Sequence, residues 1–245
     1  MTLSSTEKMD GCNAVFANTI SYIGCLVVFV VIFIVKLPAE GLFPLVGNML
    51  EGNGKKISPN AIRYILLTAW CFHFLRRGIE VFFVHIYKRK MSWIETLGGV
   101  IYYWCLALFN SWAIELYAYN PTYLPLIVIG ITLYIIGEIG NCFHHYKLRC
   151  FRTKNYEDSR MISIKTGRVV PHGGLFEYIL CPHYFCEILT WLGFFMVAWT
   201  LWSLLFLLCT IVTLVVYSNR KHEAYLNDFQ NESYPKRKRL IPFVF

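Results

Sequence analysis

The chain has few charged residues. Only 16% of its 245 residues are Asp, Glu, Lys or Arg, whereas 56% are hydrophobic and the mean hydropathy is +0.48. A chain of this composition cannot cover a folded surface with polar side chains, which argues against an ordinary water-soluble globular protein. The sequence therefore predicts an integral membrane protein.

Several functional motifs are also missing. The seven histidines contain no HxxxH pair, so we expect no metal site of the kind used by membrane desaturases. Neither a GxGxxG element nor a P-loop is present, which argues against the common soluble nucleotide-binding folds. The nine cysteines lack disulfide or zinc spacing and lie mostly in apolar segments. The segment before the first apolar run has no basic region, so we expect a retained first helix rather than a cleavable signal peptide.

Long apolar runs are what the chain does contain. About 20 helical residues cross a bilayer, and six runs approach or exceed that length, at 18–37, 63–87, 94–118, 124–143, 174–197 and 199–218. A shorter piece at 41–50 is expected to be re-entrant or part of a seventh helix. We therefore predict an all-α polytopic membrane protein of six to seven transmembrane helices. Residues 1–62 would form an N-terminal membrane anchor region and residues 63–245 the main domain.

Basic residues are concentrated beside the apolar runs. They fall in 88–90, 147–168 and 220–239, whereas the turn at 119–123 has none. The positive-inside rule places the three basic segments in the cytosol, although Lys55 and Lys56 on the opposite side do not fit. Because topology accounts for part of the net charge of +8, we expect no nucleic-acid partner.

The run 69–85 carries a polar face. His73, Arg77 and Glu80 recur at helical spacing, and Arg76 adjoins them. Two arginines at this depth require an anionic partner. Either Glu80 neutralises Arg76 as a structural pair, or the arginines bind an anionic ligand. We favour the ligand because one glutamate leaves a positive charge over.

A second polar face begins inside an apolar run and continues out of it. Asn141, His145, Arg149 and Arg152 share one side of a helix. Arginine matches phosphate with two parallel donors, so this face suits a phosphate-bearing ligand that approaches from the cytosol. The alternative is a basic patch for anionic lipids.

The run 174–197 has ionisable groups where a simple anchor would have Leu and Val. They are Glu177, His183, Tyr184 and Glu187. Each costs several kcal/mol in hydrocarbon unless it is paired or lines a wet cavity. Gly173–Gly174 and Pro182 also disturb the helix, which lipid tolerates only beside a protein cavity. We expect this segment to line a site in which Tyr184 transfers a proton. The alternative is that Tyr184 is an amphipathic tyrosine that only packs.

The last segment carries polar residues on a helix that leaves the membrane. Lys221, His222 and Tyr225 lie on its neighbouring faces. The chain ends on the apolar sequence IPFVF at 241–245, which indicates a tail held against the bilayer or the protein.

Together these motifs resemble the steroid 5α-reductase superfamily, which includes very-long-chain trans-2-enoyl-CoA reductases and polyprenol reductases. The resemblance covers about residues 65–245. It rests mainly on GGLFEYILCPHYFCEILTWLGF at 173–194 and on KHEAYLNDF and YPKRKRLIPFVF at 221–229 and 234–245. It implies a 5α-reductase-like reductase domain over 63–245, with a cytosol-facing cofactor pocket, in the endoplasmic reticulum membrane.

The resemblance also implies an activity and its residues. Members reduce a carbon–carbon double bond of a lipid substrate with NADPH. The implied catalytic residues are Tyr184 as proton donor, Arg76 and Glu187. The implied cofactor-binding residues are Arg77, Asn141, His145, Arg149, Arg152, His183, Glu187, Lys221, His222 and Tyr225.

Within the superfamily, HFLRRGIEVFFVH at 73–85 is most similar to the enoyl-CoA reductases. Phe74 stands where the steroid branch has a tyrosine, whereas His183 and Arg76 stand where enoyl-CoA reductases have Asn and Lys. The IPFVF ending is more similar to the steroid and polyprenol branches. We predict a trans-2-enoyl-CoA reductase of very-long-chain fatty acid elongation, working beside other lipid-synthesis enzymes, with a 3-oxo-4-ene steroid or a polyprenol as the alternative substrate.

Two readings from other classes remain open. The residue pattern CPHY at 181–184 is similar to one in isoprenylcysteine-type methyltransferases. A membrane scaffold that has lost its catalytic activity would also be consistent with this sequence. NADPH binding separates them, because the methyltransferase needs S-adenosylmethionine and the scaffold needs neither cofactor.

Overall fold

The fold is built almost entirely of helices. A computed structural model of the chain describes residues 11–35, 58–87, 90–117, 124–153, 169–229 and 236–245. It divides into two compact units, residues 1–41 with 67–116 and residues 42–66 with 117–245. The division concerns packing, so the domain boundary expected between residues 62 and 63 stays a prediction.

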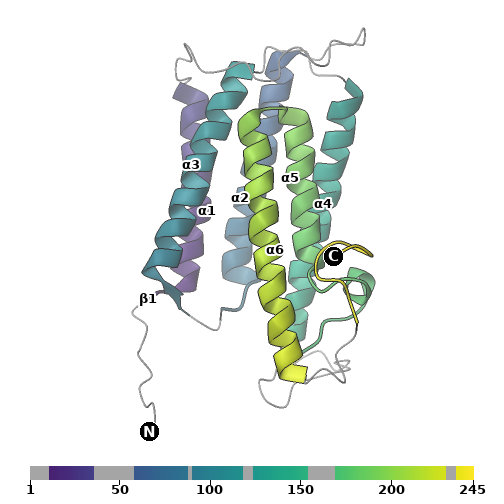
Figure 1. Cartoon of the computed structure of the whole chain (residues 1–245). Helices are drawn as coiled ribbons and strands as arrows, with labels where there is room; N and C mark the ends of the chain where they lie inside the picture. Colours follow the sequence, from purple (N-terminus) through teal and green to yellow (C-terminus); the bar gives the residue numbers. More distant parts are fainter. Residues whose placement is uncertain (1–10, 36–57, 88–89, 118–123, 154–168, 230–235) are drawn as a thin grey trace. The chain divides into compact units, whose positions relative to one another are not determined.

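The first unit contains three helices. Its elements are β1 (Gly11–Cys12), α1 (Ala14–Val35), α2 (Pro59–Phe83) from Leu67 onward, β2 (Met91–Ser92) and α3 (Trp93–Tyr117). The two short strands are antiparallel, with Gly11 opposite Ser92. Because α1 and α3 each begin directly after one of these strands, the two helices start at the same end of the unit (Figure 1).

Aromatic side chains form the core of this unit. The Phe29 ring on α1 stacks on Trp70 of α2 with centroids 4.4 Å apart, and Trp70 contacts Phe74 at 4.9 Å. All three side chains are fully buried. The Trp104 indole on α3 donates to the Ile20 carbonyl of α1 at 3.2 Å. Aromatic packing and this hydrogen bond therefore join all three helices.

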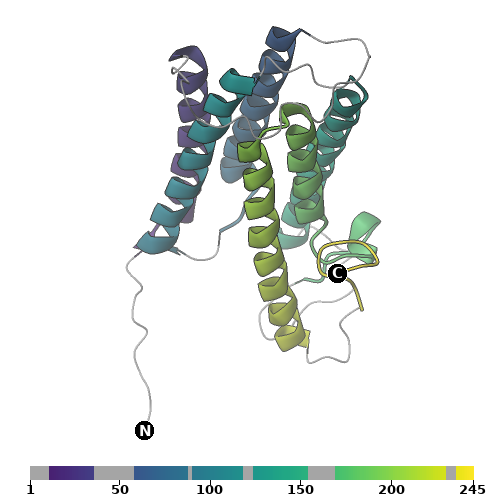
Figure 2. The same cartoon turned by 45° about the horizontal axis from the view of Figure 1, so that its top comes forward.

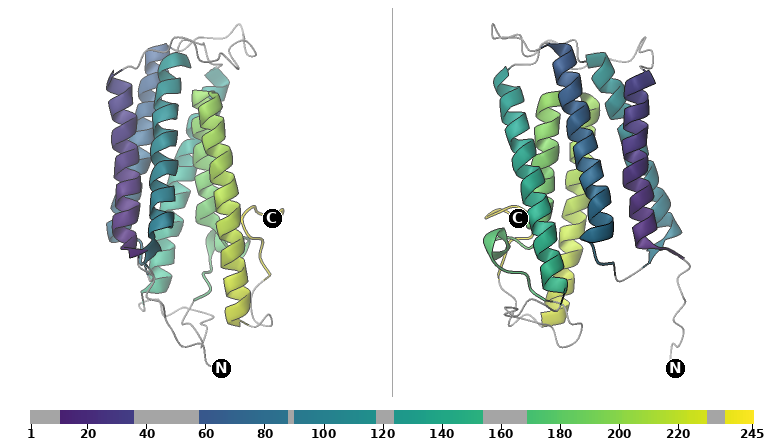
Figure 3. Two further views of the ribbon diagram at one scale, coloured as in Figure 1. Left: turned by 60° about the vertical axis from the view of Figure 1, so that its left-hand side comes forward. Right: turned by 180° about the vertical axis from the view of Figure 1, so that it is seen from behind.

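Besides the start of α2 up to Leu66, the described part of the second unit contains α4 (Leu124–Arg152), a short 3-10 helix η1 (Gly174–Glu177), α5 (Pro182–Ala198) and α6 (Leu201–Phe229). Helix α5 packs against both α4 and α6. Figures 2 and 3 show these three helices from other sides, and α6 continues well past the first turn of α5. The start of α5 is therefore flanked by the last turns of α4 and by the polar part of α6.

Small residues allow α4 and α5 to approach closely. A Cβ atom added at Gly137 of α4 would collide with the backbone of Thr190 on α5. A Cβ at Gly130 would lie 2.8 Å from the Gly193 carbonyl oxygen. Glycines let two helix backbones come together where any side chain would hold them apart. This approach sets which α4 side chains reach the first turn of α5.

A tight turn joins α5 to α6. Trp199 adopts the left-handed conformation with φ 46° and ψ 45° and ends α5. The Thr200 side chain then accepts a hydrogen bond from the Ser203 backbone at 3.1 Å, and the Ser203 hydroxyl accepts one from the Thr200 backbone at 3.2 Å. These reciprocal bonds satisfy backbone donors at the start of α6.

Four helices in the described part of the chain are long and apolar enough to cross a bilayer, namely α1, α3, α4 and α6. This composition is that of an integral membrane protein. Helix α2 is not among them and carries His73, Arg76, Arg77 and Glu80 in its second half, and α5 has only 17 residues.

The run 174–197, expected as one span, differs from the expectation. Gly173 and Gly174 have φ values of 77° and 63°, and only η1 and a turn precede Pro182, which starts α5. The left-handed glycines and the proline prevent a continuous helix. The piece at 41–50 expected to be re-entrant lies outside the described residues.

Candidate functional site

The three helices of the second unit bring together five predicted site residues. Asn141 and His145 lie on α4, His183 and Tyr184 in the first turn of α5, and Lys221 on α6. We call these residues the three-helix cluster. Asn141, His145 and His183 are buried, with exposed fractions of 1%, 6% and 3%. Residues up to 80 positions apart in the sequence therefore lie close together at one end of this apolar helix bundle.

Lys221 and His183 form the centre of the cluster. The Lys221 Nζ atom lies 3.1 Å from His183 Nε2 and 4.4 Å from the centroid of the Tyr184 ring. The rings of His183 and Tyr184 are 4.2 Å apart between centroids, and His145 lies 5.4 Å from His183. An ammonium group can only donate hydrogen bonds, so His183 Nε2 must be the acceptor. The neutral imidazole then carries its proton on Nδ1.

Two buried polar atoms in this cluster have no hydrogen-bond partner within the described residues. Asn141 donates from Nδ2 to the His183 carbonyl at 2.8 Å, which leaves its Oδ1 as an acceptor without a partner. His183 Nδ1 is likewise without one. Buried polar atoms are rarely left unsatisfied, because each costs about 1–3 kcal/mol. The cluster therefore presents one donor and one acceptor to a ligand.

The other predicted residues of this unit lie around the cluster. Arg149 and Arg152 occupy the last turn of α4. Helix α5 starts at Pro182 as expected, so Glu187 faces Trp191 one turn later and accepts its indole hydrogen bond at 3.0 Å. His222 lies beside Lys221 on α6.

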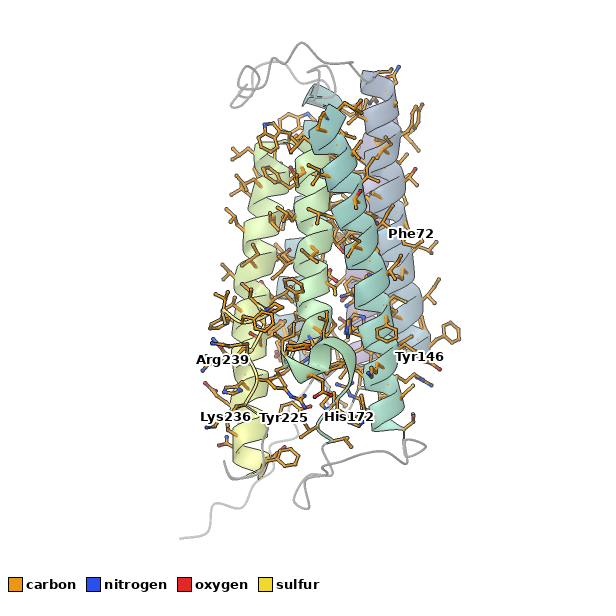
Figure 4. The ribbon with its side chains drawn as sticks, turned by 90° about the vertical axis from the view of Figure 1, so that its right-hand side faces the viewer. Phe72, Tyr146, His172, Tyr225, Lys236 and Arg239 are labelled. Atoms are coloured by element: carbon orange, nitrogen blue, oxygen red, sulfur yellow. The ribbon has the colours of Figure 1, made fainter. Side chains whose placement is uncertain are left out.

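Tyr225 makes a contact that the sequence did not indicate, and its expected role in binding the cofactor stays a prediction. Its hydroxyl donates to the Val169 carbonyl at 3.2 Å and so ties α6 to the segment before η1. Figure 4 shows Tyr225 and His172 at the end of the bundle where that segment runs. Tyr146 on α4, by contrast, is 61% exposed and points outward.

The first unit holds a polar cluster centred on Glu80. This carboxylate is 2% exposed and pairs with the guanidinium groups of both Arg76 and Arg77, the second at 2.7 Å. Arg77 also donates to the Tyr22 hydroxyl at 3.1 Å, a partner that sequence spacing did not indicate. His85 Nε2 lies 3.8 Å from the same carboxylate. Glu80 thus supplies one negative charge to two arginines, rather than to Arg76 alone.

Sequence reasoning also missed how the start of α5 is held. Residues 236–245, which we call the C-terminal hook, pair with the segment before α5. Leu180 donates to the Lys238 carbonyl at 2.8 Å and Cys181 to the Arg239 carbonyl at 3.2 Å. Burial raises the pKa of the Cys181 thiol to about 11, so the thiol stays protonated at neutral pH and adds no charge near Lys221. The only sequence signal for the hook was its apolar ending.

Comparison with known proteins identifies the family. A family model described as 3-oxo-5-alpha-steroid 4-dehydrogenase matches residues 89–245, well over half of the chain. The chain belongs to this family. The matched range contains the three-helix cluster and the C-terminal hook, whereas the Glu80 cluster lies before it.

Individual relatives carry two kinds of name. The chain is 31% identical over 206 residues to the very-long-chain enoyl-CoA reductase of Dictyostelium discoideum, which covers 83% of this chain and 64% of the relative. It is 29% identical over 188 residues to a probable very-long-chain enoyl-CoA reductase of Caenorhabditis elegans, covering 74% and 58%. It is 31% identical over 188 residues to 3-oxo-5-alpha-steroid 4-dehydrogenase 1 of Rattus norvegicus, covering 74% and 67%. The chain thus spans less than two thirds of the length of the Dictyostelium discoideum and Caenorhabditis elegans relatives.

Proposed function

We propose that this chain is a membrane-embedded, NADPH-dependent reductase of a carbon–carbon double bond in a lipid substrate. The three-helix cluster carries the proposal, because it places a half-buried cation, a half-buried tyrosine and two unsatisfied buried polar atoms at the end of an apolar bundle. Family membership and the names of the relatives support it. The endoplasmic reticulum membrane is the proposed location.

The residues of the cluster fit a nicotinamide cofactor. The carboxamide of nicotinamide has a carbonyl acceptor and an amide donor, which suit His183 Nδ1 and Asn141 Oδ1. The phosphate groups would be held by cations, for which Arg149, Arg152 and Lys221 are the candidates. Arg77, His145, Glu187, His222 and Tyr225 remain proposed contacts on the family resemblance alone. When bound, NADPH supplies the hydride for the β-carbon of the substrate.

The protein groups would handle charge and protons. Hydride addition leaves an enolate-like charge on the carbonyl oxygen, which a hydrogen-bond donor stabilises. Tyr184 is the proposed acid that protonates the α-carbon. The Lys221 Nζ atom lies 4.4 Å from the centroid of this ring, so a positive charge is close to the proposed acid. Glu187 would be oriented by Trp191. Arg76 remains a proposed catalytic residue on the family resemblance alone.

For the substrate we propose a trans-2-enoyl-CoA of very-long-chain fatty acid elongation. Phe74 is fully buried and packs on Trp70 at 4.9 Å and against Tyr22 at 6.2 Å, so this position offers no hydroxyl to polarise a steroid carbonyl. A 3-oxo-4-ene steroid is the second candidate, because the family model and the Rattus norvegicus relative carry that name. A polyprenol is the third.

The proposed arrangement in the membrane has six to seven spans. Helices α2 and α5 would join the four apolar helices as spans, with their polar residues turned toward the site. The basic ends of α4 and α6 would face the cytosol, so that the cofactor pocket opens there while the substrate enters from lipid.

The test is NADPH oxidation by the full chain reconstituted in lipid nanodiscs. A trans-2-enoyl-CoA, a 3-oxo-4-ene steroid and a polyprenol would be assayed in parallel. We expect oxidation with the enoyl-CoA and a fall in kcat of roughly 100-fold or more in Tyr184→Phe, the usual contribution of a general acid. Tyr146→Phe is the matched control, since this exposed tyrosine on α4 should keep full activity.

Each outcome decides between the candidates. Turnover of only the steroid or the polyprenol would move the chain to that branch and leave the site in place. No turnover together with no NADPH binding would refute the reductase, and binding of S-adenosylmethionine instead would indicate the methyltransferase. Equal activity of both tyrosine variants would remove Tyr184 as the acid.

A further inference from the structure

The C-terminal hook exposes large apolar side chains outside any helix. Phe243 and Val244 are 78% and 72% exposed, and Ile241 is 39% exposed. Tyr178, which precedes α5 and is 54% exposed, contacts the Phe243 ring with centroids 5.7 Å apart. Such a group of apolar side chains next to each other marks an interaction surface.

The backbone that carries these side chains is fixed. Lys238 donates to the Tyr178 carbonyl at 3.1 Å, and Leu240 and Ile241 donate to the Phe245 carbonyl at 2.8 and 2.7 Å. The Leu240 side chain is fully buried. Leu240 therefore anchors the hook, and the exposed side chains are held outward rather than hanging on a loose tail.

The hook lies at the level where α6 changes from apolar to basic. Arg239 Nη1 donates to Asn219 Oδ1 at 2.8 Å, and Asn219 stands between the apolar part of α6 and Arg220. Figure 4 shows Arg239 and Lys236 beside α6. Two residues before Asn219 on α6, Tyr217 is 46% exposed. An exposed tyrosine at the end of an apolar run is typical of the membrane–water boundary.

Positive charges flank the apolar side chains of the hook, although the exposed Glu177 precedes Tyr178. Lys236 and Lys238 are exposed, and residues 236–245 contain no Asp or Glu. An apolar tip flanked by lysines matches the boundary between acyl chains and anionic headgroups. A water-exposed role or an acidic protein partner would not need Phe243 and Val244 at the same place.

We propose that the C-terminal hook, together with Tyr178, is an interfacial anchor that inserts Phe243 and Val244 into the headgroup boundary of an anionic leaflet. Lys236 and Lys238 contact the lipid phosphates. Because the hook is hydrogen-bonded to Leu180 and Cys181, this anchor fixes the height of the first turn of α5 relative to the bilayer. The proposal is independent of the reaction that the protein catalyses.

The test measures the depth of the hook in the bilayer. An environment-sensitive fluorescent amino acid is placed at position 243 of the full chain in vesicles that contain brominated lipids, which quench by contact. Reference probes are placed at Val212, which is 64% exposed in the apolar part of α6, and at Glu223, which is exposed beyond it. We expect quenching at 243 to be at least about twofold that at 223 and closer to that at 212.

A second arm tests the charge. Quenching at 243 should rise when phosphatidylglycerol replaces part of the phosphatidylcholine, and the double variant Lys236→Gln/Lys238→Gln should lose that rise. A probe at 244 repeats the measurement at an independent exposed position. Quenching at 243 and 244 no greater than at 223 would overturn the anchor, and cross-linking between copies through position 243 would then assign the surface to a second copy. The same quenching in both lipid compositions would overturn the contact with anionic headgroups.

Discussion

Lys221 holds a positive charge among neutral groups. Within the described residues its contacts are His183 Nε2 at 3.1 Å and the Tyr184 ring. We expect Lys221→Met to weaken NADPH binding by roughly 10- to 100-fold, because a hydrogen bond to a charged group contributes about 1.5–3 kcal/mol. The measurement is the NADPH dissociation constant in nanodiscs.

Thermal stability separates this role from a structural one. Methionine in place of a half-buried cation removes a charge that is partly withdrawn from water, so the Tm of Lys221→Met should stay unchanged or rise. Arg220→Met is the matched control, because it removes the same charge from an exposed neighbour on α6. Equal dissociation constants for the two variants would contradict the assignment of Lys221 to phosphate.

Glu80, in contrast to the cation Lys221, is a single buried carboxylate between two guanidinium groups. Its removal leaves Arg76 and Arg77 without their shared anion. We expect Glu80→Gln to reduce the free energy of unfolding by roughly 3–5 kcal/mol, the usual effect of breaking a buried pair from one side. Thermal unfolding in detergent, followed by circular dichroism, measures the loss.

Glu95→Gln is the control for this change. Glu95 accepts the Ser92 backbone hydrogen bond at 2.9 Å in the exposed first turn of α3, and glutamine can make the same bond. Its Tm should match that of the unchanged chain. A Glu80→Gln variant that unfolds at the same temperature would show that the arginines obtain their stability elsewhere.

At the scale of the helices, the close approach of α4 and α5 positions the three-helix cluster. Gly137→Ala puts a methyl group against the Thr190 backbone, and overpacking of this kind costs about 1–3 kcal/mol. The displaced helix should also weaken the bond from Asn141 to the His183 carbonyl. We expect a lower Tm together with lower NADPH affinity, measured on the same sample.

Gly98→Ala on α3 is the control, and we expect it to change the stability in the opposite direction. No atom lies within 4 Å of a Cβ at this position, so alanine should raise stability slightly through its better helix propensity. If both glycine variants gain stability, α4 and α5 are not held at the separation described above.

The helices themselves were largely predictable from the sequence, whereas the site was predictable only in part. The apolar runs 18–37 and 199–218 correspond to α1 and α6, because burial in lipid makes hydrophobicity a nearly complete signal. For the run 174–197, hydropathy alone predicted one span, whereas Gly173–Gly174 and Pro182 already indicated the disturbance that delays the start of α5 to Pro182.

Contacts between helices were the part that could not be predicted. Helical spacing put Asn141 and His145 on one face, and the fold confirms that both are buried there. The contact of Lys221 with His183 joins residues 38 positions apart and depends on how α6 packs on α5. Likewise the IPFVF ending indicated a held tail but not its partner at 178–181.

At the scale of the whole molecule, the proposed topology makes a prediction about the two ends of α6. Leu201 and Glu223 are 22 residues apart, which at 1.5 Å per residue is about 33 Å and matches the bilayer core. If α5 and α6 both span, the turn at Trp199 lies in the lumen and the basic end of α6 in the cytosol. In intact microsomes a membrane-impermeant maleimide should then label Glu223→Cys, whereas Leu201→Cys should react only after permeabilisation.

The unchanged chain supplies the background for this labelling. Its exposed cysteines, Cys105, Cys142 and Cys209, lie on apolar helices, where a maleimide dissolved in water should not reach them. Labelling of both engineered positions before permeabilisation would place both ends of α6 on the cytosolic side. Helix α6 would then not cross the bilayer, which would contradict the proposed topology. Labelling of Leu201→Cys alone in intact microsomes would invert the topology and put the proposed NADPH site in the lumen, away from the cytosolic phosphate route through Arg149 and Arg152.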